Sequence, residues 1–323
     1  MYRACPDRDA SPPKLRRFAP LMGGIFEEVA MRFLHALQPR RDGLKAAGFY
    51  LLFACHCLFA LNTLAQDTAG AKVVAPPRLS RGEMEEFLLK AKVVEQKNLS
   101  MGVTNSQRAV LDDGKLRHNA HIQTVDISKT SFQTIQGTEM NFRDCYKFNV
   151  AAYQLDKLLE LNMVPVSVER KVGSMAAVTW WVDDAVMTEL DRKKKKIEPA
   201  DLHSWNQQMY VCRVFDQLIY NTDRNLGNLV ITKDWNVWMI DHTRAFRMMK
   251  DLRSPQNLVQ CDRRLLAKLR ELNKAALSKQ LGQYLTPSEI EGLLARRDKI
   301  VNFFDKQVAQ KGEAAVLFDL ERK

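Results

Sequence analysis

The sequence predicts an α+β protein with two lobes, a β-rich small lobe over residues 80–182 and a mainly helical large lobe over 183–323. Two observations support this fold class. Short apolar runs bounded by Gly, Asp and Pro, which are typical of strands and turns, gather between 92 and 182. Leucines at helical spacing fill the chain after 263, and one short hairpin, expected at 229–240, precedes them.

The first element in chain order is a leader over residues 1–65. Basic residues at 40–45 precede an apolar run at 46–61, and small residues up to Ala65 follow it. This order is typical of a secretory signal peptide. The alternative is an uncleaved anchor, although the run is short against the roughly 20 residues that span a bilayer. We therefore expect an exported protein, periplasmic or secreted, with membrane anchoring through the leader as the alternative.

The small lobe begins after a linker at 66–79. Ser80-Arg81-Gly82-Glu83 has the spacing of a capping box and predicts a helix over 81–91. A polar loop is expected at 127–142. Three strands are expected between that helix and the loop, at 92–96, 104–111 and 116–125.

An amphipathic helix is expected at 143–161, and Pro165 follows it. Two strands, at 164–170 and 176–182, are then expected to pair around Gly173. They complete the small lobe.

The large lobe opens with the basic run Arg192–Lys196, which is expected to be a solvated face. The alternative is a contact for an acidic substrate, a phosphate or an anionic membrane. Helices are expected at 211–220, at 263–281 and after Thr286, where Pro287 begins a first turn containing a Glu.

Composition excludes several classes of function. The 323 residues include 46% hydrophobic ones, which is typical of a globular chain. The six cysteines show neither metal-ligand pairing nor a disulfide framework. The net charge of +11 would suit nucleic acid, but the chain has no zinc spacing and no aromatic RNA-binding strand, and it carries an export signal. Nucleic acid is therefore not expected as a partner.

Acidic and amide side chains flank the predicted hairpin. Asp223 and Asn228 precede its first strand in the spacing Asp-x-x-x-x-Asn, and Asp241 directly follows its second strand. Phosphoryl transfer needs such a set, because one carboxylate orients the attacking hydroxyl while an amide oxygen and a second carboxylate hold the divalent metal. Asp and Asn are also common turn formers, which is the structural alternative.

Asp223-Arg-x-x-x-Asn followed by an apolar residue and Asp241 resembles the catalytic and metal-binding segments of atypical kinases. These include phosphoinositide kinases, HipA-like kinases and the secretory-pathway family of Golgi casein-kinase and Four-jointed-like kinases. The stretches 149–170 and 240–246 favour the secretory-pathway family and uncharacterised bacterial proteins of this type. The resemblance covers about 100–305 and implies a two-lobed protein-kinase-like fold with its catalytic and metal hairpin at 221–247.

The resemblance assigns roles residue by residue. It implies that Asp223 is the catalytic Asp, that Asn228 and Asp241 hold metal, and that the cofactors are ATP with Mg²⁺ or Mn²⁺. Arg244 would contact a nucleotide phosphate or brace the Asp241 loop, and these two roles stay open.

Two cofactor-binding positions depart from the family pattern. Gln123 stands where the nucleotide-binding Lys is expected, and Asn149 stands where its Glu partner is expected. A neutral pair cannot clamp phosphates as a Lys–Glu pair does. Either another lysine substitutes, or the nucleotide binds in an unusual way, or the protein is a pseudokinase acting through a partner. The candidate lysines are Lys115, Lys129 and Lys147.

The expected function is phosphorylation of a hydroxyl acceptor, with a protein favoured and an acidic one considered. A kinase for a small molecule, such as a sugar or lipid headgroup, is an alternative, as is a purely structural envelope protein. An exported compartment has no obvious ATP supply, so an inward-facing anchor or a donor other than ATP also stays open.

Overall fold

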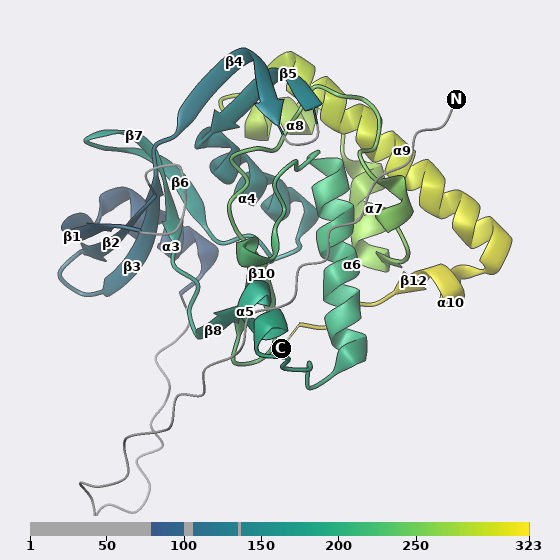
Figure 1. Ribbon diagram of the computed structural model, residues 1–323, viewed down its shortest axis with the longest axis horizontal. Coiled ribbons are helices and arrows are strands. Elements are labelled where there is room, and N and C mark those ends of the chain that lie inside the picture. Colours follow the sequence, from purple (N-terminus) through teal and green to yellow (C-terminus); the bar gives the residue numbers. More distant parts are fainter. Residues whose placement is uncertain (1–78, 100–105, 135–136, 323) are drawn as a thin grey trace, which may run out of the picture. The chain divides into compact units, whose positions relative to one another are not determined.

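The computed structural model describes residues 79–99, 106–134 and 137–322 (Figure 1). The chain divides into two compact units at Pro76–Pro77, and all described residues belong to the second. The predicted leader at 1–65 lies outside the described residues, as does most of the predicted linker, so export and anchoring stay predictions. Within the described part of the chain, no helix combines the length and apolar character needed to cross a bilayer.

An antiparallel five-stranded sheet in the order β1-β2-β3-β7-β6 forms the framework of the small lobe (Figure 1). Helix α3 (Arg81–Lys90) begins at the predicted capping box and places Phe87 edge-on against Trp180 of β7. The strands are β1 (Lys92–Asn98), β2 (Gln107–Asp112), β3 (Arg117–Gln123), β6 (Ser167–Val172) and β7 (Ser174–Trp180).

The polar loop predicted at 127–142 is wrong, because β4 (Asp126–Thr134) and β5 (Gly137–Cys145) form an antiparallel hairpin there. Most hairpin side chains are exposed, so the sequence lacks the apolar alternation that marks a half-buried strand. Phe132 and Phe142 stack on each other with ring centroids 4.2 Å apart. The predicted helix start at 143 is also wrong, since β5 runs to Cys145.

Helix α4 (Lys147–Leu159) is the most deeply buried helix of the small lobe and contacts both the sheet and the large lobe. It packs against β6 and β7 and also against α7 and α8. Its buried residues include the polar Asn149 and Asp156. A helix enclosed in this way can transmit the position of one lobe to the other.

The large lobe packs helices around a small sheet in the order β10-β9-β8. The sheet strands are β8 (Ala185–Thr188), β9 (Leu229–Thr232) and β10 (Val237–Met239). The helices are α5 (Glu189–Lys194), α6 (Leu202–Leu218), α7 (Arg263–Glu271), α8 (Lys274–Leu281), α9 (Pro287–Lys311) and α10 (Glu313–Val316). Short elements complete it: η1 (Leu226–Asn228), η2 (Pro255–Asn257), and a parallel pair, β11 (Cys261–Asp262) with β12 (Leu317–Phe318).

Two predictions about these helices change. The helix expected at 263–281 is two helices, because Asn273 caps α8 by accepting from the Ala276 amide at 2.9 Å. The basic run is only partly solvated. Arg192 is buried, and its Nε donates to Glu189 Oε2 at 2.6 Å. Lys193–Lys196 are exposed, as predicted.

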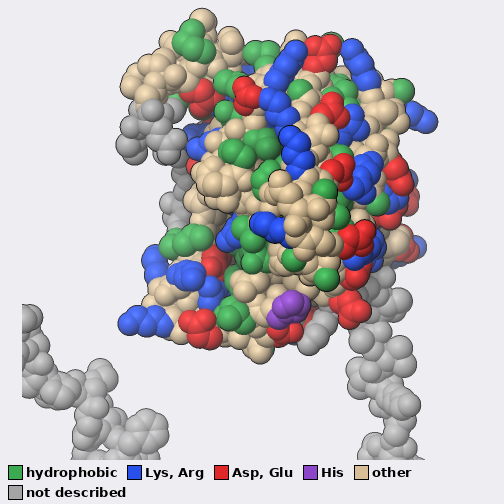
Figure 2. Space-filling model, turned by 90° about the vertical axis from the view of Figure 1, so that its right-hand side faces the viewer, with side chains coloured by type: hydrophobic (Ala, Val, Ile, Leu, Met, Phe, Trp, Pro, Cys, Tyr) green, Lys and Arg blue, Asp and Glu red, His purple; other side chains and the backbone are tan. Residues whose placement is uncertain are grey.

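Charges of both signs alternate on the face seen at the right of Figure 1. Figure 2 shows Lys and Arg interspersed with Asp and Glu there, with only small separated apolar groups. Such a surface carries no large field of one sign.

Candidate functional site

The loop between α6 and β9 places Asp223 at the surface while fixing its backbone. Asn221 Oδ1 accepts from the Asp223 amide at 3.0 Å, and Asn221 Nδ2 donates to Asp216 on α6 at 3.0 Å. Thr222 Oγ1 donates to the Arg244 carbonyl at 2.9 Å. The Asp223 side chain itself remains 43% exposed. The local structure thus presents a partly exposed carboxylate on a rigid support.

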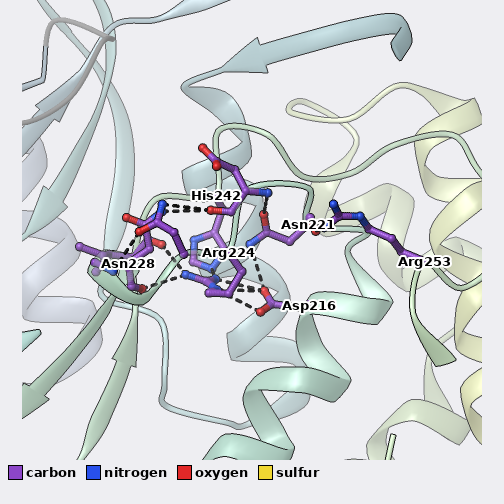
Figure 3. A network of polar contacts seen from close by, with 10 residues as sticks. Asp216, Asn221, Arg224, Asn228, His242 and Arg253 are labelled. Carbon is purple, nitrogen blue, oxygen red and sulfur yellow. Dashed lines mark hydrogen bonds and ion pairs between the residues drawn. The ribbon is translucent and has the colours of Figure 1, made fainter. Parts of the chain in front are cut away.

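Arg224 joins three parts of the large lobe in one network (Figure 3). Its Nε donates to Asp216 Oδ2 at 3.0 Å, and its Nη1 donates to the carbonyls of Asn228 and Ile240, both at 2.8 Å. Its Nη2 donates to His242 Nε2 at 3.0 Å, so the His242 proton lies on Nδ1. Burial opposes the charge of Arg224, but Asp216 raises its pKa. Arg224 therefore stays cationic and structural.

The hairpin places Asn228 beside Ile240, the residue that precedes Asp241. The Ile240 amide donates to the Asn228 carbonyl at 3.1 Å, which aligns the two ends. Asn228 Nδ2 donates to the Asp223 carbonyl at 3.2 Å, and no described group donates to its Oδ1. Asp241 has a φ of 53°, in the left-handed region that Asn and Asp tolerate best among non-glycine residues. Strained backbone of this kind gathers at functional sites.

His242 is a buried structural residue. Burial lowers its pKa well below the ordinary value, and the neighbouring Arg224 lowers it further. The ring is therefore neutral at neutral pH and serves as an acceptor for Arg224.

Asp144, at the end of β5, belongs to the same site, although the sequence analysis did not identify it. Its Oδ2 accepts from Arg244 Nε at 2.8 Å, and Arg244 Nη1 lies 3.7 Å from Asp223 Oδ2. Asp144 is almost fully buried, and its Oδ1 has no hydrogen-bond partner among the residues that the structure describes. A charged residue between Phe142 and Cys145 is a usable signal, but the helix predicted over 143–161 places Asp144 in its first turn, whereas β5 continues to Cys145.

Burial and four neighbouring charges, those of Arg244, Asp241, Asp144 and Arg224, shift the pKa of Asp223. Burial raises its pKa, Arg244 lowers it, and the carboxylates of Asp241 and Asp144 raise it. The net direction is upward. Asp223 therefore holds a proton more readily than an ordinary Asp, as a group near other carboxylates does.

Gln123 and Asn149 are both buried and bonded to the protein. Gln123 Oε1 accepts from the amides of Thr124 and Val125 at 2.9 and 3.1 Å, and its Nε2 donates to Ser106 at 3.0 Å. Asn149 Oδ1 accepts from the His242 amide at 2.7 Å. Asn149 therefore joins α4 to the residue after Asp241, and Gln123 fixes the turn after β3.

His121 is the β3 side chain within electrostatic reach of Asp241. Burial lowers the pKa of His121, and the Asp241 carboxylate opposes that shift. Its cross-strand neighbour is Arg108 on β2, whose guanidinium lies over the Trp181 ring, 4.7 Å from its centroid. This face of the sheet thus offers a neutral His and an exposed Arg in place of a lysine.

The candidate lysines occupy other places. Lys147 Nζ lies 3.8 Å from Glu169 on β6, and Lys115 lies in the β2–β3 turn. Lys129 lies on the β4–β5 hairpin. None of them stands on the β3 face that carries His121.

Solved structures share the fold of this chain, whereas the two comparisons of its sequence found no match. No family model matches the sequence, and no curated protein matches it. A hydra Fam20 structure with sugar is 14% identical, with a TM-score of 0.54 over 74% of this chain and 92% of that one. A Golgi casein kinase is 11% identical, with a TM-score of 0.52 over 73% of this chain and 78% of that one. A structure of the Golgi casein kinase with Mn/ADP bound, 11% identical over the same shares of the chains, gives 0.51.

The chain has an atypical kinase-like fold. The two-lobed protein-kinase-like fold expected from the resemblance is thereby confirmed, with a β-rich small lobe and a helical large lobe. Identities this low show the fold alone, so the roles of individual residues rest on the geometry of this chain.

The side chains at this site have oxygen atoms of the kind that a hard divalent cation prefers. Asn228 and Asp241 could offer an amide oxygen and a carboxylate to Mg²⁺ or Mn²⁺. Across the described ranges, no cluster of three or more His, Cys, Asp or Glu could hold a metal by itself. The remaining ligands would be phosphate oxygens and water, as is common for Mg²⁺. The unpaired, buried Asp144 Oδ1 is one further oxygen in the same group of interacting carboxylates.

Proposed function

We propose that this protein is a metal-dependent phosphotransferase that moves a phosphoryl group from a nucleotide to a hydroxyl acceptor. One observation carries the proposal. Arg224 fixes the backbone at Asn228 and at Ile240, which precedes Asp241, and Asn221 fixes the amide of Asp223, while the Asp223 carboxylate stays partly exposed. An arrangement held in place before substrate arrives is what phosphoryl transfer requires, since catalysis there is mostly positioning and charge neutralisation.

Each residue has a distinct role in this proposal. Asp223 orients the acceptor hydroxyl and accepts its proton. Asn228 and Asp241 hold Mg²⁺ or Mn²⁺, which would neutralise phosphate charge when bound. Arg244, shared between Asp144 and Asp223, sets the direction of the Asp223 carboxylate. The Mn/ADP in the Golgi casein kinase structure supports testing Mn²⁺ beside Mg²⁺ with ATP as the donor.

The acceptor is proposed to be a protein, with a small-molecule hydroxyl as the alternative. The exposed lysines Lys193–Lys196 favour an acidic acceptor. Export through the 1–65 leader remains part of the proposal, and amino-terminal sequencing of the mature protein checks it: cleavage after Ala65 is expected.

A pseudokinase is the second candidate, and a specific observation favours it. The β3 face offers the neutral His121, and Gln123 is occupied by backbone amides, so no lysine on that strand clamps the phosphates. Such a protein would bind nucleotide and act through a partner.

Phosphotransfer from labelled ATP separates the two candidates. The full-length protein is incubated with Mn²⁺ or Mg²⁺, an acidic protein such as casein, and a panel of sugar and lipid-headgroup alcohols. Transfer that falls at least a hundredfold in Asp223→Asn, but not in Asp234→Asn, supports the kinase. Asp234 is a matched control because it is an exposed Asp in the β9–β10 turn. Nucleotide binding without transfer to any acceptor would favour the pseudokinase.

A further inference from the structure

The backbone of Asp241 is held on both sides. Its φ of 53° lies in the left-handed region, which is unfavourable for a residue with a side chain. On the amino-terminal side, Arg224 Nη1 donates to the Ile240 carbonyl at 2.8 Å. On the carboxyl-terminal side, the His242 amide donates to Asn149 Oδ1 at 2.7 Å. These two bonds fix the peptide planes that flank Asp241, one from the large lobe and the other from the small lobe.

The Asn149 contact is one member of a row of hydrogen bonds that joins the end of β5 and the start of α4 to the segment after Asp241. Rising residue numbers in one segment pair with falling numbers in the other, so the two segments lie side by side in opposite directions. The row therefore ties the small lobe to this part of the site. The bonds run from His242 N to Asn149 Oδ1 at 2.7 Å, from Cys145 N to Thr243 O at 2.9 Å, and from Arg244 Nε to Asp144 Oδ2 at 2.8 Å.

Thr243 extends this control from the backbone to the side chain of Asp241. Its Oγ1 donates to Asp241 Oδ1 at 3.1 Å, and its own carbonyl accepts from the Cys145 amide. Thr243 is buried, whereas Asp241 is partly exposed. The small lobe thus orients one oxygen of a carboxylate that solvent can still reach.

Asn149 serves this contact rather than a lysine. It is buried on α4 at 6% exposure, and its Oδ1 accepts from a backbone amide. On the same helix, Lys147 lies near Glu169, and β3 carries no lysine. The neutral amide also adds no negative charge beside Asp241, whose carboxylate already raises the pKa of its neighbour Asp223. A neutral acceptor is therefore suited to holding the backbone at this point.

We propose that Asn149 is a positioning residue for the metal site. By holding the His242 amide from the small lobe, it sets the backbone of Asp241 and, through it, the direction of the carboxylate. The metal role of Asp241 belongs to the proposed function, so this inference rests on that proposal. It differs from the role that the resemblance implies for this position, which is to pair with a nucleotide-binding lysine. The small lobe then helps to assemble the metal site through a backbone contact.

Amide hydrogen exchange of the full-length protein, without metal or nucleotide, tests whether Asn149 holds the backbone. Asn149→Leu removes the acceptor, so exchange at residues 241–243 is expected to rise about tenfold. Asn149→Asp keeps an acceptor oxygen and is expected to stay within about threefold of wild type. Gln154→Leu is the matched control, because it removes a hydrogen bond between α4 and Gln280 of α8. It is expected to leave exchange at 241–243 unchanged.

Titration with Mn²⁺ in the presence of ADP, followed by the paramagnetic resonance signal of free Mn²⁺, tests the link to the metal. Asn149→Leu is expected to weaken Mn²⁺ binding about tenfold, as loss of an orienting contact behind a metal ligand does. Asn149→Asp is expected to bind at least as tightly as wild type, and Gln154→Leu equally tightly. Thr243→Val keeps the test decisive if Asn149→Leu fails to fold. It removes the donor to Asp241 Oδ1 and is expected to weaken binding about threefold.

The outcomes separate this inference from the proposed function. Wild-type protein that binds Mn²⁺, with unchanged affinity in Asn149→Leu and Thr243→Val, overturns the positioning role and leaves the proposed function standing. Equal weakening by Gln154→Leu also overturns it, because any lost contact of α4 would then have the same effect. Unchanged exchange at 241–243 in Asn149→Leu shows that Asn149 does not hold this backbone. Wild-type protein that binds no Mn²⁺ with ADP overturns the proposed function and the positioning role together.

Discussion

The candidate site has two walls, one formed by the large lobe around Arg224 and one formed by β2 and β3 of the small lobe. They differ in how many of their polar groups are hydrogen-bonded within the protein. On the large-lobe wall, Arg224 alone bonds to Asp216, to two carbonyls and to His242. On the small-lobe wall, β3 presents His121, which burial keeps neutral, beside the exposed Arg108 of β2. One wall is a closed network, whereas the other has no cation buried and paired in place.

This difference indicates how the function is divided between the lobes. The large-lobe wall holds its geometry without a ligand, so it can position a metal and a hydroxyl. The small-lobe wall lacks a Lys–Glu clamp on β3 and α4, so under the proposed function phosphate binding there would depend on the exposed Arg108 or on the nucleotide's own metal. We therefore expect substitutions in the large-lobe wall to lower the stability of the fold. Substitutions in the small-lobe wall are expected to change the affinity for nucleotide.

The largest expected effect is a loss of stability when the Arg224 network of the large-lobe wall is removed. Arg224→Met leaves the Asp216 carboxylate and the Ile240 carbonyl without their buried partner. Removing one member of a buried ion pair costs about 3–5 kcal/mol. Chemical denaturation is expected to show that loss, with Arg213→Met, an exposed Arg on α6, within about 0.5 kcal/mol of wild type. Equal midpoints for Arg224→Met and wild type would show that the network is not structural.

A smaller effect is expected from pH. The folded pKa of His242 lies well below its ordinary value of about 6.5, so as pH falls the unfolded chain takes up the proton first. The contribution of His242 to stability is thus complete above about pH 6.5 and declines below it by up to about 1.4 kcal/mol per pH unit, until its folded pKa is reached. His121 contributes with the same sign.

Denaturation midpoints between pH 7.5 and 5 check this prediction. The decline is expected to be shallower in His242→Asn, whose amide oxygen can still accept from Arg224. An unchanged decline in this variant would mean that other groups control the acid sensitivity.

The smallest expected effect is tighter ATP binding after a substitution on the small-lobe wall. His121→Lys places a cation within reach of Asp241 and of a bound phosphate, and is expected to tighten ATP binding about threefold to tenfold. Gln123→Lys is the matched comparison. Its side chain is buried and holds two backbone amides, so this change is expected to lower stability by about 2 kcal/mol without tightening binding. Tighter binding by Gln123→Lys alone would assign the lysine position to Gln123 after all.

The sequence predicted the large-lobe wall well because its information is local. The predicted strands at 229–232 and 237–240 are confirmed as β9 and β10, and the turn residues bring Asn228 close to Ile240 as expected. The capping box predicted at Ser80 and the helix start predicted at Thr286 are likewise confirmed, since both depend on residues at most three apart.

The small-lobe wall could not be predicted from the sequence, because its residues come together through contacts between segments that are far apart in the chain. The exposed β4–β5 hairpin carries no apolar alternation, so β5 was assigned partly to a loop and partly to a helix. Because of that error Asp144 was not recognised as a site residue. Its place in the site depends on the hydrogen bond from Arg244, a hundred residues away. His121 is likewise defined by its reach to Asp241 across the lobes, which no local pattern reveals.

The most direct test of the central claim is thermal unfolding of the full-length protein with ATP and Mn²⁺ or Mg²⁺. We expect the midpoint of wild type to rise by several degrees only when nucleotide and metal are both present, as ligand binding to the folded state requires. Asp241→Asn, which keeps the left-handed backbone accessible, is expected to lose that rise, and Asp234→Asn to keep it. A wild-type midpoint that does not move with any metal–nucleotide pair, or an equal rise in Asp241→Asn, would contradict a metal–nucleotide site at Asp223, Asn228 and Asp241.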